Sequence, residues 1–340
     1  MSAPTLDLFR AADILTPWAV RVAATLRIAD HLAAGRTRLP DLAEAAGADT
    51  DALGRLLRHL ARQGVFAEPS EGVFALTESA EPLRTDHPGS WRARLDLTGI
   101  GGRIDGAFAG LLHSVRTGEP GYSSVFGRSF WADAADPSII PSFDAIMSGH
   151  DYWFHEVAEG YDWAGVSTVV DVGGGAGGLL TEILSRFPRL SGTVFDLPAT
   201  VVEAKKVLEE AGLTGRATTY GGDFFEPLPP GADVYLLSNV LHDWSDPDAR
   251  RILRRCAEAA GRDGRVLIAD RVVDDRADQS VTAMDLRVLV LMGGRERTEA
   301  AWRALAGSAD LTVGKVVRRD RGVTLLDCAL DDRARIDDVG

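Results

Sequence analysis

Cysteine is nearly absent from this sequence, with only Cys256 and Cys328 among 340 residues. The two do not form a closely spaced pair of the kind that holds a metal through thiolates. So few cysteines also fit the reducing environment of the cytoplasm, where disulfides are rare. We therefore expect a cytoplasmic protein without a cysteine-bound metal.

Long hydrophobic runs and an excess of positive charge are also lacking. No apolar stretch reaches the roughly 18 residues of a membrane-spanning helix, and the first residues do not show the basic-then-apolar pattern of a secretory signal. The formal net charge is -13, and this sign opposes general attraction to nucleic acid and to anionic lipid. We expect no nucleic-acid or membrane partner, which leaves a small molecule as the default ligand.

The N-terminal part of the chain has the pattern of a winged helix. Residues 11–34 carry apolar side chains at helical spacing, interrupted early by Pro17. Residues 39–66 then indicate a short helix, a turn and a second helix that Asp49 or Thr50 caps, and two short strands follow. A winged helix is often a DNA-binding module, but four cationic side chains on its second helix are more typical of a solvated face.

Further along, the pattern changes twice. The middle of the chain mixes helical stretches with glycine-rich breaks and many aromatic rings, which can line a pocket for a flat ligand. Later, short β-rich runs alternate with helical stretches, which predicts an α/β fold with a Rossmann-like, doubly wound parallel sheet. The runs are residues 167–172, 191–197, 216–221, 233–240 and 264–273. We expect three parts: a winged-helix domain (1–100), a helical middle segment lining the acceptor pocket (101–160) and a ligand-binding α/β domain (161–340).

The first β-rich run is followed by a glycine-rich loop and then a helix. Gly173, Gly175 and Gly178 satisfy the G-x-G-x-x-G spacing, in which glycines let the backbone turn sharply and approach a ligand. Asp196 lies 21 residues past Gly175, at the end of the second run, where a carboxylate can accept from two ribose hydroxyls. NAD and S-adenosylmethionine both fit this pattern.

Charge favours S-adenosylmethionine. Asp171 lies two residues before the first glycine, and the loop has no lysine or arginine. A carboxylate there repels a pyrophosphate but suits the ammonium group of a methionine moiety. After the third run, Asp223 can accept from an adenine amino group while Phe224 packs on the ring face.

These blocks, VVDVGGGAGG, FDLP and GGDFF together with LHDWSD and GGRERT, resemble the class I O-methyltransferases that act on phenols. Within that family the chain most resembles the anthracycline-type polyketide-tailoring enzymes, the group of carminomycin 4-O-methyltransferase and aclacinomycin 10-hydroxylase. The likeness covers nearly the whole chain. It implies an N-terminal winged-helix domain that forms a homodimer instead of binding DNA, and a catalytic domain that needs no metal. It assigns cofactor contacts to Gly173, Asp196, Asp223, Phe224 and Ser238.

The chemistry of phenol methylation calls for a base, because a phenol loses its proton only near pH 10. His242 follows the fourth β-rich run and is expected to face the ligand crevice. Asp270, at the end of the fifth run, or Glu296, in a later glycine-rich loop, can orient the imidazole and stabilise its cation. The resemblance gives the three residues these roles, and the sequence leaves open which carboxylate orients His242.

The acceptor is predicted to be a small aromatic molecule. Met147 matches a methionine of the family that flanks the acceptor ring, and we expect Trp131 and Asp285 to contact the acceptor as well. The carminomycin-type enzyme has no histidine at the position of His242, and the hydroxylase relative transfers no methyl group in its main reaction. A hydroxylase or decarboxylase acting on a similar scaffold therefore stays an alternative, and a ligand-sensing regulator built on the winged helix is a more distant one.

Overall fold

The computed structural model of the chain describes residues 7–136, 138–147, 151–273 and 279–331. The chain forms two compact units, the first from Met1–Phe108 and Arg128–Gly149, the second from Ala109–Gly127 and His150–Gly340. The segment that we expected to form a separate middle part, residues 101–160, is thus divided between the two units. Some of its helices belong to the first unit and others to the second.

The first unit contains the predicted winged helix, made of α4 (Leu39–Ala46), α5 (Thr50–Arg62), β1 (Phe66–Ser70) and β2 (Val73–Leu76). Helix α4 ends at Gly47, whose φ of 61° is easily adopted by glycine. The carboxylate of Asp49 accepts a hydrogen bond from the Ala52 amide and so caps α5. Strands β1 and β2 pair antiparallel. Of the two candidate caps, Asp49 fills the position and Thr50 is the first helical residue.

Three short helices precede the winged helix: α1 (Leu8–Ala11), α2 (Leu15–Thr25) and α3 (Ile28–Ala33). The expected interruption at Pro17 is wrong, because Pro17 lies in the first turn of α2, where no intrahelical bond needs its missing N–H. The break comes instead at Arg27, which adopts a left-handed backbone with φ 55°. Four apolar side chains at the start remain 62–93% exposed: Leu8, Phe9, Ile14 and Leu15.

The remaining helices of the first unit are η1 (Glu78–Leu83), α6 (Arg92–Leu95), α7 (Ile100–Gly106), α10 (Phe130–Ala134) and α11 (Ile140–Met147). Helices α6, α7 and α11 contact one another. Asp133 of α10 is buried between Arg103 and Arg128, with a carboxylate oxygen 2.8 Å from each guanidinium. This buried carboxylate is therefore fully compensated by neighbouring positive charge.

The second unit is built on a seven-stranded sheet in the order β10-β11-β7-β6-β3-β4-β5. Five consecutive strands of this order are β3 (Thr168–Val172), β4 (Ser191–Asp196), β5 (Ala217–Gly221), β6 (Val234–Ser238) and β7 (Arg265–Asp270). All five run parallel, and β3 pairs with both β4 and β6. The strand order therefore reverses between β3 and β6, and in open α/β sheets ligands commonly bind at the carboxyl ends of the strands at such a point.

The sheet is mixed, not wholly parallel as the sequence led us to expect. Strand β11 (Thr324–Leu330) runs antiparallel to β7 and to β10 (Leu311–Arg318). This C-terminal hairpin lies beyond the last alternating β-rich run that the sequence analysis used. A second, two-stranded parallel sheet joins β8 (Val272–Val273) to β9 (Arg297–Thr298).

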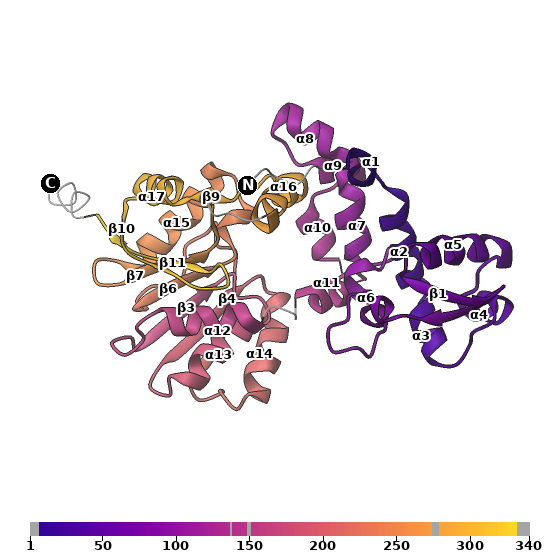
Figure 1. Cartoon of the computed structure of the whole chain (residues 1–340). Helices are drawn as coiled ribbons and strands as arrows, with labels where there is room; N and C mark the ends of the chain where they lie inside the picture. The colour runs from indigo at the N-terminus through magenta and orange to yellow at the C-terminus, as the bar shows by residue number, and fades with distance from the viewer. Residues whose placement is uncertain (1–6, 137, 148–150, 274–278, 332–340) are drawn as a thin grey trace. The chain divides into compact units, whose positions relative to one another are not determined.

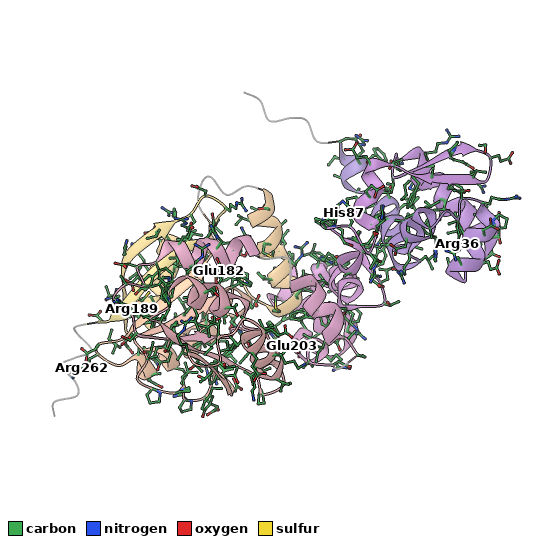
Figure 2. All side chains as sticks on the ribbon, turned by 90° about the horizontal axis from the view of Figure 1, so that it is seen from below. Arg36, His87, Glu182, Arg189, Glu203 and Arg262 are labelled. Carbon is green, nitrogen blue, oxygen red and sulfur yellow. The ribbon has the colours of Figure 1, made fainter. Side chains whose placement is uncertain are left out.

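Helices cover both faces of the large sheet (Figure 1). On one face are α12 (Asp151–Gly160), α13 (Gly178–Arg186) and α14 (Thr200–Glu210), and on the other α15 (Asp246–Ala260) and α17 (Glu299–Ser308). Alternate residues of the strands enter two separate hydrophobic clusters, one against each helical layer. Charged side chains such as Arg189, Glu203 and Arg262 are exposed to solvent on this unit (Figure 2).

The other helical segments of the second unit are α8 (Leu111–Thr117), α9 (Gly121–Phe126), η3 (Leu241–Asp243) and α16 (Gln279–Met292). The short helix η2 (Ala107–Gly110) spans the change from the first unit to the second. Helix α16 contacts α8, α9 and η3. Over the described part of the chain, every helix is too short or too polar to cross a bilayer.

Candidate active site

The predicted cofactor residues follow neighbouring strands of the large sheet. Asp171 lies within β3, Asp196 ends β4, and Ser238 ends β6. Because these strands are parallel, their carboxyl ends meet at one edge of the sheet. The fold thus brings together groups that are up to 67 residues apart in the sequence.

The glycine-rich loop after β3 is held against β4 by Asp196. Gly173, Gly175 and Gly177 have φ between 56° and 79°, in the left-handed region that glycine adopts without strain. The Gly175 amide donates to Oδ2 of Asp196 at 2.9 Å, and the Leu197 amide donates to Oδ1 at 2.7 Å. Asp196 therefore fixes the loop at the same edge where it was predicted to bind ribose.

Asp171 is a buried carboxylate that forms no ion pair with any of the described residues. It is 1% exposed, and among the described residues its Oδ2 has no hydrogen-bond partner. Burial raises the pKa of Asp171 to about 7, and the nearby charge of Asp196 adds to the rise. A Cβ at Gly174 would lie 2.7 Å from this carboxylate oxygen, so only glycine leaves room there. A buried carboxylate of this kind fits a site that receives a positively charged group.

The acid–aromatic pair after β5 lies beside the same loop. Asp223 is exposed, and its Oδ1 accepts from the Phe225 amide at 2.9 Å. The ring of Phe224 is 3.7 Å from the position of a Cβ built on Gly173. Phe224 also makes an edge contact with Trp244, with centroids 5.7 Å apart. Phe224 thus lies beside the glycine loop, and contact of Asp223 and Phe224 with a ligand stays a prediction.

The end of β6 carries two polar side chains in succession. The Trp153 indole donates to the Ser238 hydroxyl at 2.9 Å, which leaves the hydroxyl proton available to a ligand. The next residue, Asn239, has a left-handed backbone with φ 52°, and its amide donates to the Ala269 carbonyl of β7. A non-glycine residue in this conformation is typical of a functional turn.

His242 lies in η3 and is surrounded by carboxylates. Its Nδ1 is 3.1 Å from Oε1 of Glu296 and 3.6 Å from Oδ1 of Asp270. Because an ionised carboxylate only accepts hydrogen bonds, Nδ1 carries a proton that it donates to Glu296. In the neutral imidazole, Nε2 is then the basic nitrogen. The structure therefore brings all three predicted catalytic residues together, with Glu296 in hydrogen-bond contact and Asp270 slightly farther away.

The carboxylates make His242 strongly basic. Burial by itself lowers the pKa of His242, but the charges of Asp270, Asp243 and Glu296 outweigh it and raise the pKa to about 10. Burial also raises the pKa of Asp270, to about 6, against the opposing charge of His242. The imidazole of His242 is therefore protonated at neutral pH.

Two further residues at this site were given no role by the sequence analysis. Oδ1 of Asp243 is 3.4 Å from His242 Nε2, and burial raises the pKa of Asp243 to about 7. Arg297 is buried and bonds to main-chain carbonyls on either side of His242. The sequence offered one signal for both residues, because each is a charged residue directly beside a predicted catalytic one. Asp243 follows His242 in LHDW, and Arg297 follows Glu296 in GGRERT.

The three predicted acceptor contacts lie in different parts of the structure. Asp285, on α16, accepts from the Glu296 amide at 2.8 Å and so supports the loop of a catalytic residue. Trp131, in the first unit, is 37% exposed beside Phe130. The side chain of Met147 lies outside the described residues. Contact of these three residues with an acceptor stays a prediction.

The nitrogen and carboxylate oxygens of His242, Asp270 and Glu296 all lie within 4.8 Å of one another. Such a group of ligand atoms has the composition of a metal site as well as that of a base with its orienting carboxylates. The hydrogen bond between His242 Nδ1 and Glu296 is sufficient to explain why these groups lie together, without a metal ion between them.

A Rossmann-like sheet with a glycine loop and acids at its strand ends is the arrangement expected of a class I methyltransferase, and the comparisons with known proteins give this class. Residues 108–311 match the O-methyltransferase domain family, and residues 10–86 match the O-methyltransferase dimerisation domain. The chain therefore belongs to the O-methyltransferase family and is an S-adenosylmethionine-dependent O-methyltransferase. Its N-terminal winged helix is the dimerisation domain of that family.

Individual relatives agree with this assignment. The chain is 49% identical to the 2,7-dihydroxy-5-methyl-1-naphthoate 7-O-methyltransferase of Streptomyces carzinostaticus, over 92% of this chain and 94% of that protein. It is 46% identical to the aclacinomycin 10-hydroxylase of Streptomyces purpurascens, over 92% and 85%. The predicted resemblance to polyketide-tailoring enzymes is thus confirmed.

Among solved structures, the chain is similar to an O-methyltransferase from neocarzinostatin biosynthesis in complex with S-adenosyl-L-homocysteine and 1,4-dihydroxy-2-naphthoic acid. The TM-score is 0.91 at 46% sequence identity, and the match covers 96% of this chain and 100% of that one. A further structure of the same enzyme holds S-adenosylmethionine and 2-hydroxy-5-methyl naphthoic acid.

Proposed function

We propose that this enzyme methylates a phenolic hydroxyl of a naphthoate-like aromatic natural product, with His242 as the general base. The observation that carries the proposal is the donation from His242 Nδ1 to Glu296, which makes Nε2 the basic nitrogen. The naphthoate named as the substrate of one similar enzyme, and the naphthoic acid bound in a similar structure, support the class of acceptor.

S-adenosylmethionine, when bound, supplies a methyl group already activated on a sulfonium. The chain offers Asp171 to its ammonium group, Asp196 to its ribose hydroxyls, and Ser238 as a further polar contact. Asp223 and Phe224 are proposed to hold the adenine. The glycines of the loop, including Gly173 and Gly175, allow the close approach that this requires.

The proposed proton transfer is closely balanced. A phenol has an ordinary pKa of about 10, and the pKa of His242 is raised to about 10. His242 acts as a base only in its neutral form, whose population rises as the pH approaches this pKa. From that form Nε2 can take the phenol proton with little free-energy cost, and the resulting imidazolium is stabilised by Glu296 and Asp270. Alignment of the acceptor oxygen supplies the rest of the rate acceleration.

We infer that the enzyme works as a homodimer, because the exposed apolar side chains of α1 and α2 are of the kind that an interface covers. Trp131, Met147 and Asp285 are proposed to contact the acceptor. The two cysteines are both unpaired and buried, which fits a cytoplasmic location.

The decisive experiment combines product mass with the His242→Ala variant. Wild-type enzyme, incubated with cofactor and a hydroxynaphthoate, should yield a product heavier by one methylene. His242→Ala should bind S-adenosylhomocysteine normally but lose turnover by about 10²–10⁴-fold, the usual worth of a positioned base. The loss should shrink above about pH 10, where the acceptor is ionised in solution. A variant that methylates at the wild-type rate refutes the role of His242.

A second candidate is hydroxylation of a related scaffold, which the 46% identity to a hydroxylase favours. The same product analysis separates the two reactions, since hydroxylation adds one oxygen in place of one methylene. We expect only methylation.

Catalysis is proposed to need no metal, although the His242 cluster has the composition of a metal site. Dialysis against a chelator should leave the rate unchanged. A lost rate that returns only with added divalent cation would refute this.

A further inference from the structure

Arg297 is a buried cationic side chain near the proposed base, with 1% of its side chain exposed. Burying a guanidinium is costly unless its donors are satisfied. Its Nε lies 2.9 Å from Oδ1 of Asp246, and its face lies over the ring of Trp302 at 5.0 Å from the centroid. These contacts compensate for the burial of the Arg297 guanidinium.

The remaining donors of Arg297 hold the turn that carries His242. Nη1 donates to the carbonyl of Leu241 at 2.8 Å, and Nη2 donates to the carbonyl of Trp244 at 2.9 Å. These two carbonyls flank the His242-Asp243 pair. The planar, forked guanidinium can bridge them at fixed spacing, which a lysine ammonium cannot do.

The main chain around Arg297 connects the other two members of the cluster. Glu296, its direct neighbour, accepts from His242 Nδ1. Strand β9, which begins at Arg297, pairs with β8, which follows Asp270 by two residues. Arg297 thus lies where the three segments that deliver His242, Asp270 and Glu296 meet.

The segments that carry His242 and Glu296 are in close main-chain contact. The Arg295 amide donates to the His242 carbonyl at 2.8 Å, and a Cβ at Gly294 would collide with that same carbonyl. The position of the turn therefore depends on close main-chain contacts that Arg297 completes from the other side.

We propose that Arg297 is a positioning residue of the methyl-transfer reaction. It holds the turn Leu241–Trp244 so that Nδ1 of His242 stays on Glu296 and Nε2 stays available to the phenol. The inference rests on the proposed role of His242 as base. A displacement of about 1 Å at a catalytic group can cost about 10²-fold in rate, so loss of the fork is expected to matter even with the charge retained.

The first test compares two acceptors in Arg297→Lys. With an ordinary hydroxynaphthoate, kcat should fall by about 10–100-fold while the affinity for S-adenosylhomocysteine stays at the wild-type value. With a nitro-substituted phenol that is already ionised at the assay pH, the loss should be several-fold smaller, because no base is needed. Equal losses on both acceptors would overturn the inference and leave Arg297 a purely structural residue.

Arg265→Met is the matched control. Arg265 also forms a forked pair, at 2.6 and 2.8 Å with Asp327, but at the opposite end of the strand that ends in Asp270. This variant should lower the thermal midpoint without changing the ratio of rates on the two acceptors. If Arg297→Lys gives too little folded protein, Asp246→Asn weakens the same anchor from its half-exposed side and should give a smaller loss with the same acceptor preference. Wild-type rates in Asp246→Asn would then overturn the inference.

A double-variant cycle separates this inference from the proposed function. If Arg297 acts through His242, adding Arg297→Lys to His242→Ala should cost little or nothing further, since residues that act as one unit are strongly non-additive. A His242→Ala enzyme with wild-type rate overturns the base itself and this inference with it. A slow His242→Ala enzyme that loses the full Arg297→Lys factor again in the double variant overturns the role of Arg297 alone.

Discussion

The cofactor region and the base region lie at the same edge of one sheet but differ in how their polar groups are held. Around the glycine loop, most contacts are made by the backbone, and the buried carboxylate Asp171 has an oxygen without a partner among the described residues. Around His242, side chains hold one another, with the imidazole on Glu296 and the guanidinium of Arg297 on the flanking turn, although Oδ2 of Asp270 and Oε2 of Glu296 also have no partner among the described residues. We therefore propose that a ligand of opposite charge completes the first region, whereas the hydrogen bonds that hold the imidazole in the second are already formed without a ligand.

This difference predicts which kinetic quantity each region controls. Changes in the base region should lower kcat and leave cofactor affinity intact, because these residues act on the proton. Changes in the cofactor region should alter binding and apo stability. A base-region variant that lowers cofactor affinity, or a cofactor-region variant that lowers kcat, would show that the two regions are coupled.

The largest effect is expected for Glu296→Gln, which removes the carboxylate that accepts from His242 Nδ1. We expect kcat to fall by about 10²-fold, below the full worth of the base. Removing a carboxylate that favours the imidazolium also lowers the pKa of His242. The rising limb of the pH–rate profile, which in the wild type should extend toward the His242 pKa of about 10, should therefore move to lower pH.

Asp270→Asn should behave in the same direction but lose less, because its carboxylate is 3.6 Å from Nδ1 against 3.1 Å for Glu296. Rates across pH for both variants test this order. Glu299→Gln is the control: it is three residues from Glu296 and pairs with Arg303 and Arg318 instead of His242. A larger loss in Asp270→Asn than in Glu296→Gln would reverse the assignment of the orienting carboxylate.

The sequence predicted the parts of this comparison that depend on local pattern. Strand ends, glycine spacing and the acids beside them follow from short-range periodicity, so Asp171, Asp196 and His242 could be placed at one edge. The antiparallel C-terminal hairpin was missed, because it breaks the strand–helix alternation that identified the other strands. The role of Arg297 was also missed, since its partners lie 53 and 56 residues away and no periodicity links them.

An intermediate effect is expected for Asp196→Ala. The variant should weaken S-adenosylhomocysteine binding by roughly 1–3 kcal/mol, the cost of leaving polar partners unmatched, while kcat at saturating cofactor changes little. Titration calorimetry measures the affinity. Asp233→Ala is a matched control, because Asp233 likewise accepts from two backbone amides, those of Ser167 and Thr168, at the opposite edge of the sheet. Equal affinity losses in the two variants would count against a ligand role for Asp196.

The smallest effect concerns stability and compares two buried aspartates. Asp171 and Asp133 are each 1% exposed, but Asp133 is paired with two arginines and Asp171 has its pKa raised to about 7 by burial. Between the unfolded value of about 4 and about 7, folded Asp171 keeps a proton that the unfolded chain has lost. This carboxyl therefore costs stability as pH rises through that range, and the full cost remains above it.

Asp171→Asn should accordingly raise the thermal midpoint of the cofactor-free enzyme at pH 8, by about 2–4 °C for each kcal/mol gained, and the gain should shrink toward pH 5. The same variant should bind S-adenosylhomocysteine more weakly, because an amide cannot match the charge of an ammonium group. Asp133→Asn should instead lower the midpoint at pH 8, since it leaves two arginines without their carboxylate. Thermal unfolding of both variants at the two pH values provides the measurement. A destabilised Asp171→Asn with unchanged affinity would mean that Asp171 is a structural residue, and that the cofactor region is as complete without its ligand as the base region.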